Sequence, residues 1–154
     1  QIAPWFPGRY DEDTFQEMMK HLEMGHKPQF LVLSLTESDE WSHMYFYDRY
    51  IKALQKQDQY IKQLYNYLEK QSFYQDKTIY IITTDHGRGE GWEWGKHNQF
   101  ISGSENIWSL VHLPKNSPPS LQWMAKSIGQ AFQPCNHLAI SQLMAKTLGI
   151  LQKK

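Results

Sequence analysis

Two runs of uncharged residues stand out from an otherwise mixed polar sequence. Residues 30–35 read Phe-Leu-Val-Leu-Ser-Leu, and residues 78–84 read Thr-Ile-Tyr-Ile-Ile-Thr-Thr. Continuous runs of this length are typical of strands that are buried on both faces, as in a parallel sheet covered by helices. A third run, residues 107–113, is closed by Pro114. We predict parallel strands at 30–35 and 78–84, with residues 107–113 joining the same sheet.

A helix-like pattern fills the interval between the first two runs. We predict a helix over residues 45–70, because its apolar residues recur at steps of three and four, with Asp58 as an interruption. The stripe is Tyr47, Ile51, Leu54, Ile61, Tyr65 and Leu68. A strand, a helix and a parallel strand form a right-handed crossover unit. Shorter helices are predicted at 11–24, 121–132 and 139–148, and the polar residues 37–43 are predicted to be a loop. The pattern therefore predicts a three-layer α/β/α domain with a mainly parallel sheet.

Acidic and histidine side chains follow both of the first two predicted strands. Asp39 and His43 follow the first, Asp85 and His86 follow the second, and His97 lies in a loop of about twenty residues. In open α/β sheets, ligands bind beyond the carboxyl ends of the strands. Carboxylate and imidazole ligands suit zinc or manganese, and two such ions could clamp the attacking and leaving oxygens of a phosphoryl transfer. The simpler alternative is a strand followed by a polar turn.

Composition narrows the class of protein. The 154 residues are 40% hydrophobic and 21% charged, which suits one globular domain, and the formal net charge of zero gives no electrostatic case for a nucleic-acid partner. The lone Cys135 excludes an internal disulfide framework. No apolar run approaches the roughly 20 residues of a membrane span. Because no signal peptide or initiator Met opens the chain, we expect a fragment or a processed chain.

The order of the ligand-type residues resembles that of a known family. Asp39-x-x-x-His43, then Asp85-His86-Gly87, then a lone His97 is similar to the alkaline phosphatase superfamily, in its nucleotide pyrophosphatase/phosphodiesterase and sulfatase-like branches. The resemblance spans about residues 30–151. It implies an alkaline-phosphatase-like fold, a small phosphate- or sulfate-ester substrate, and a periplasmic or extracellular location.

The same resemblance implies two divalent metal ions, zinc first, with manganese or calcium as alternatives. Asp39, His43 and His97 would hold one ion, and Asp85 with His86 would help to hold the other. Arg88 and Lys96 would bind the anionic substrate, although a surface role for each stays equally open. We expect Trp92 and Trp94 to pack within the loop rather than against substrate.

The chain departs from the family pattern in one respect. The family's Ser, Thr or cysteine-derived nucleophile and a further Asp ligand precede the Asp-x-x-x-His pair, and no residue here matches them. We therefore expect residues 1–154 to be the C-terminal part of a single hydrolase domain, inactive alone, which pairs with an N-terminal half or self-associates. The alternative is a non-catalytic α/β module that acts in assembly or binding.

Overall fold

A computed structural model describes residues 8–123, 141 and 145 of the chain. The chain divides into two units, Gln1–Gln75 and Asp76–Lys154. The described part of the first unit contains α1 (Asp11–Glu23), α2 (Glu37–His43) and α3 (Tyr47–Leu68). The second contains β1 (Tyr80–Thr83), a single 3₁₀ turn at Gly91–Glu93 and β2 (Ser109–His112). Residues 119–123 are helical, so the predicted helix at 121–132 is described over its first three residues; its remainder lies outside the described residues, as does the predicted helix at 139–148 apart from residues 141 and 145.

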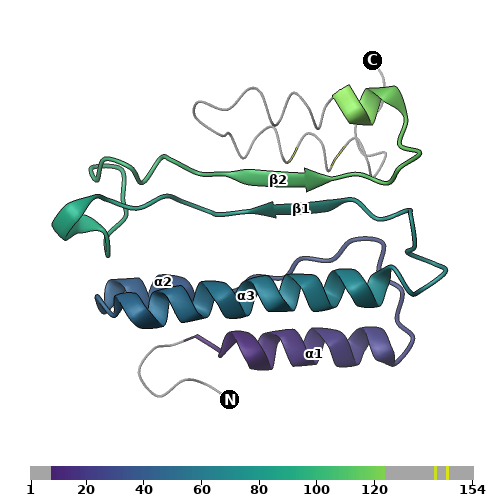
Figure 1. Cartoon of the computed structure of the whole chain (residues 1–154), viewed down its shortest axis with the longest axis horizontal. Helices are drawn as coiled ribbons and strands as arrows, with labels where there is room; N and C mark the ends of the chain where they lie inside the picture. Colours follow the sequence, from purple (N-terminus) through teal and green to yellow (C-terminus); the bar gives the residue numbers. More distant parts are fainter. Residues whose placement is uncertain (1–7, 124–140, 142–144, 146–154) are drawn as a thin grey trace. The chain divides into compact units, whose positions relative to one another are not determined.

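The core of the first unit lies between α1 and α3, which run side by side in Figure 1. Phe15 and Leu22 of α1 and Tyr60 and Leu68 of α3 are buried. The rings of Phe15 and Tyr60 stack with their centroids 4.4 Å apart. Burial raises the pKa of the Tyr60 phenol to about 12, and the nearby carboxylates add to the effect. The two predicted helices at 11–24 and 45–70 are confirmed, each within a few residues of its predicted bounds.

The predicted apolar stripe of α3 is only partly correct. Tyr60 lies outside that stripe and is 3% exposed, whereas Tyr47 lies on it and is 60% exposed. The Gln57 side-chain amide donates a hydrogen bond to Asp11 of α1 at 2.8 Å, so the turn that carries Gln57 and Tyr60 faces α1. A polar pairing has therefore set the rotation of the helix, which a hydrophobic pattern alone does not encode.

The prediction of a loop at residues 37–43 is wrong, because these residues form α2. The short helix carries Asp39 and His43 within one and a half turns. Its first turn is acidic, which suits the positive end of a helix dipole, and this signal was present in the sequence.

The second unit is built on an antiparallel pair of strands (Figure 1). Tyr80 pairs with His112 and Thr83 pairs with Ser109. Predicted strands at 78–84 and 107–113 are confirmed in shortened form, and they do share a sheet. Beyond the strand ends, the N–H of Thr84 donates to Trp108 O and that of Gly87 donates to Ser104 O, so the connecting segment leaves and returns at the same end of the antiparallel pair.

The three-layer parallel sheet is not confirmed. In the part of the chain that the structure describes, the sheet has two strands, and residues 31–36 form neither helix nor strand. An apolar run shows that a segment prefers burial, but it does not specify a hydrogen-bonding partner, and a strand needs one. Among the described residues, no helix is long and apolar enough to cross a bilayer.

Candidate metal centre

Asp39 and His43 lie one turn apart on the same face of α2. Their Oδ2 and Nε2 atoms are 3.3 Å apart, and both side chains are partly exposed. Two ligand atoms that each lie about 2.0–2.2 Å from a tetrahedral zinc ion are roughly 3.3–3.6 Å from one another. The carboxylate and the imidazole thus have the separation that two ligands of a single ion require, and helix geometry supplies it through the i, i+4 spacing.

The start of α2 is held by a reciprocal pair of carboxylates. Asp11 Oδ1 accepts the backbone N–H groups of Thr36 at 2.7 Å and Glu37 at 3.2 Å. In return, Glu37 Oε2 accepts the backbone N–H of Asp11 at 2.9 Å. Each carboxylate therefore binds N–H groups that the first turn of the other helix leaves without an intrahelical partner. Burial raises the pKa of the Glu37 carboxyl, although its hydrogen bond from Asp11 acts in the opposite direction.

The end of α2 is fixed by a Schellman motif. The N–H of Tyr45 donates to Ser42 O at 2.9 Å, and the N–H of Phe46 donates to Trp41 O at 3.0 Å. This motif needs a left-handed residue, and Tyr45 supplies it with a φ of 59° where glycine is favoured. The Arg49 guanidinium then lies 4.5 Å from the centre of the Trp41 ring, which joins α2 to the first turn of α3. Both ends of the ligand-bearing helix are therefore fixed.

Asp85 and His86 follow β1 in the second unit. His86 Nδ1 lies 2.9 Å from the carbonyl oxygen of Gly87. Because a carbonyl oxygen only accepts, Nδ1 donates in this contact, and in the neutral imidazole the lone pair is then on Nε2. That Nε2 atom lies 3.6 Å from Asp85 Oδ1, again within the separation expected of two ligands of one ion. A backbone carbonyl that fixes the tautomer of a histidine is the usual support for a metal-binding imidazole.

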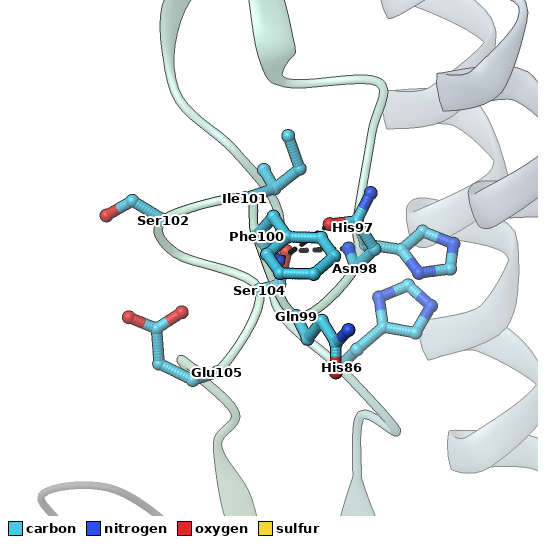
Figure 2. Close-up of a pocket in the computed structure, with 9 residues that line it drawn as sticks. All are labelled: His86, His97, Asn98, Gln99, Phe100, Ile101, Ser102, Ser104 and Glu105. Atoms are coloured by element: carbon cyan, nitrogen blue, oxygen red, sulfur yellow. Dashed lines mark hydrogen bonds between the residues drawn. The ribbon is translucent and has the colours of Figure 1, made fainter.

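His97 reaches the same place from the long loop. Its ring stacks on that of His86 with the centroids 3.5 Å apart and the planes inclined by 13°. Figure 2 shows the two rings face to face beside a hollow that the loop encloses. Both side chains are partly buried. The structure therefore brings together the rings of His86 and His97, which lie eleven residues apart in sequence.

Close backbone crossings hold this loop in place. A Cβ atom on Gly87 would collide with the carbonyl oxygens of Gly103 and Asn106, and one on Gly103 would collide with that of Arg88. The N–H of Gly87 donates to Ser104 O at 2.7 Å across the same crossing. The Ser104 hydroxyl in turn accepts the N–H of Asn98 at 3.1 Å, next to His97 (Figure 2). Glycines therefore place the two histidine-bearing segments in contact.

The remaining predicted residues differ in their surroundings. Arg88 is half-buried in the loop, whereas Lys96 is exposed and lies 4.0 Å from Glu93. Trp92 is 93% exposed, so the expectation that it packs within the loop is wrong. It sits in a 3₁₀ turn too short to bury it. The sharing of one ion by Asp39, His43 and His97 stays a prediction, as does the substrate-binding role of Arg88 and Lys96.

A family model described as type I phosphodiesterase / nucleotide pyrophosphatase matches residues 5–126. No curated protein and no solved structure matches the chain.

Proposed function

Because the chain belongs to the type I phosphodiesterase / nucleotide pyrophosphatase family, we propose that it supplies the metal ligands of a phosphoester hydrolase. The family is one of phosphodiester- and pyrophosphate-cleaving enzymes of the alkaline phosphatase superfamily, it is metal-dependent in general, and its substrates are small esters. The match includes every ligand-type residue discussed above.

The contact between His86 and the Gly87 carbonyl carries this proposal. In the neutral imidazole it leaves the lone pair on Nε2, which lies 3.6 Å from Asp85 Oδ1, and the ring stacks on that of His97. Metal-binding histidines usually donate their other ring N–H to a carbonyl or carboxylate in this way. The donor set of imidazole nitrogen and carboxylate oxygen also fits zinc or manganese better than calcium, which prefers oxygen alone.

We assign Asp39, His43 and His97 to one ion and Asp85 with His86 to a second. A divalent ion in such a site supplies Lewis-acid polarisation of the ester oxygens. The carboxylates of Asp39 and Asp85 would balance the charge of the ions, and the imidazoles would bind as neutral ligands. Arg88 and Lys96 would then attract the anionic ester from the same loop.

The nucleophile is proposed to come from outside the residues that carry these ligands. Thr36 and Ser38 lie three residues and one residue before Asp39, and their positions at the start of α2 do not match the family's order. We therefore propose that the 154 residues alone bind metal weakly and turn over no ester, and that an N-terminal half or a second copy completes the site.

The test uses p-nitrophenyl phosphate, bis-p-nitrophenyl phosphate and p-nitrophenyl sulfate with the purified chain, with and without zinc or manganese. The proposal expects no turnover by the chain alone and metal-dependent cleavage of the diester once the nucleophile is supplied in a longer form. Robust metal-dependent turnover by the chain alone would locate the nucleophile within it. A longer form that cleaves only the sulfate would move the assignment to sulfate esters. A longer form that binds no metal would favour the non-catalytic module.

A further inference from the structure

One carboxylate in the first unit is buried although it lies outside the proposed metal site. Asp11 is 3% exposed and stands at the first position of α1. Charged side chains are almost never buried to this extent unless they are paired or fully hydrogen-bonded. The hydrogen bonds of Asp11 should therefore account for its burial.

The two oxygens of Asp11 bind different parts of the unit. Oδ1 accepts the N–H groups of Thr36 and Glu37 at the start of α2. Oδ2 accepts the side-chain amide of Gln57 in α3, and the same amide donates to Ser38 Oγ at 3.2 Å. One side chain therefore ties α1, α2 and α3 together, and it does so at the turn that begins the ligand-bearing helix.

The consequence for the ligands follows from the length of α2. Asp39 lies two residues after Glu37, and His43 lies in the last turn of a helix of seven residues. So short a helix is not stable by itself, so its position depends on what holds its ends. At its start, the side-chain bonds come from Asp11, reinforced by Gln57 on Ser38.

We propose that Asp11 is a positioning residue that sets the placement of Asp39 and His43 for metal binding. The inference rests on the proposed function for the identity of these ligands. It assigns no contact between Asp11 and the metal or the substrate. It predicts that metal affinity depends on the hydrogen-bond polarity of a side chain that does not itself bind the ion.

Three variants of the full chain test this proposal. Asp11→Asn keeps the oxygen that accepts from Thr36 and Glu37, but it turns the group facing Gln57 into a donor. Asp11→Asn combined with Gln57→Glu reverses donor and acceptor and restores that hydrogen bond. Glu12→Gln is the matched control, because it removes a charge from the same turn of α1 while its side chain is exposed.

The readouts are Mn²⁺-induced broadening of the NMR signals of Asp39 and His43, and amide hydrogen exchange over residues 36–43. Partners that orient ligands typically change metal affinity by 10–100-fold, and we expect a loss on the order of tenfold for Asp11→Asn. We expect faster exchange over α2 in the same variant, recovery of both readouts in the double variant, and no change in Glu12→Gln. Should Asp11→Asn not fold, Gln57→Met removes the same contact more mildly and is expected to show a smaller loss of the same kind.

The outcomes separate this proposal from the proposed function. Equal effects of Asp11→Asn and Glu12→Gln, or no recovery in the double variant, would overturn the positioning role. If Mn²⁺ broadens the NMR signals of neither Asp39 nor His43 in the wild type, the proposed role of these two residues as metal ligands is wrong. Amide exchange over α2 then still decides whether Asp11 positions the helix: unchanged exchange in Asp11→Asn would refute it.

Discussion

The pair Asp39–His43 and the pair His86–His97 are both of the type that binds metal, but the chain holds them in opposite ways. The first pair is four residues apart on a helix whose ends are fixed by side-chain and backbone hydrogen bonds. The second is eleven residues apart on irregular backbone, brought together where glycines allow two segments to cross. The helical pair should therefore respond to changes in the groups that hold the ends of α2, whereas the loop pair should respond to changes at the glycine crossing.

The largest expected effect is at the crossing itself. Gly87→Ala places a methyl group against the carbonyls of Gly103 and Asn106, which are backbone and cannot rotate away. Overpacking of this kind costs about 3 kcal/mol or more. The matched control is Gly91→Ala, which meets no atom within 4 Å and carries only the strain of its φ of 54°, about 1 kcal/mol. Denaturant unfolding of both variants makes the comparison, and equal losses would show that the crossing does not hold the loop.

These two pairs also differ in how far the sequence predicts them. The helices at 11–24 and 45–70 follow from apolar periodicity, and the ligand residues follow from their type and order. The stacking of His86 on His97 and the glycine crossing depend on contacts between distant backbone segments, which no local pattern records. The antiparallel pairing of β1 with β2 was missed for a related reason, since an apolar run does not reveal its neighbour.

A second test addresses the packing of α3 against α1, in the unit that carries the helical pair. Since the folded-state pKa of Tyr60 is raised from 10.0 to about 12, its contribution to stability is complete below pH 10 and is lost as the pH rises through about 12. We expect a loss on the order of 2 kcal/mol across that window. Tyr60→Phe keeps the stack on Phe15 and should remove most of this dependence, whereas Tyr65→Phe, at an exposed position, should retain it. Circular dichroism during alkaline titration measures the unfolding of both variants. The same pH dependence in the two variants would contradict the attribution of this dependence to Tyr60.

A smaller effect is expected from the hydrogen bond beside His97. Ser104→Ala removes the acceptor of the Asn98 N–H and should cost about 1 kcal/mol, with a matching rise in amide exchange at Asn98. Ser102→Ala, at an exposed position in the same loop, serves as the control and should change neither value. Loss of stability without faster exchange at Asn98 would mean that Ser104 acts elsewhere.

The smallest expected effect is a gain in folding stability. Tyr45→Gly relieves the left-handed strain at the end of α2, and part of the benefit is lost to the greater entropy of the unfolded chain. We expect a net stabilisation of about 0.5 kcal/mol. Tyr47→Gly, in the first turn of α3, should instead destabilise by about 1 kcal/mol. Thermal unfolding distinguishes the two, and a loss of stability in Tyr45→Gly would show that its side-chain contacts outweigh the strain.

Zinc binding by the full chain tests the central claim most directly. Because the chain alone should bind metal weakly, zinc is added in excess and calorimetry gives the affinity; X-ray absorption of the bound zinc should show a nitrogen and oxygen shell at about 2.0–2.1 Å with imidazole scattering. Zinc affinity and imidazole scattering should fall in His97→Ala and in His86→Ala. They should be unchanged in His112→Ala, whose ring in β2 lies beside Tyr80. Zinc bound without imidazole, or bound equally by all three variants, would contradict the account.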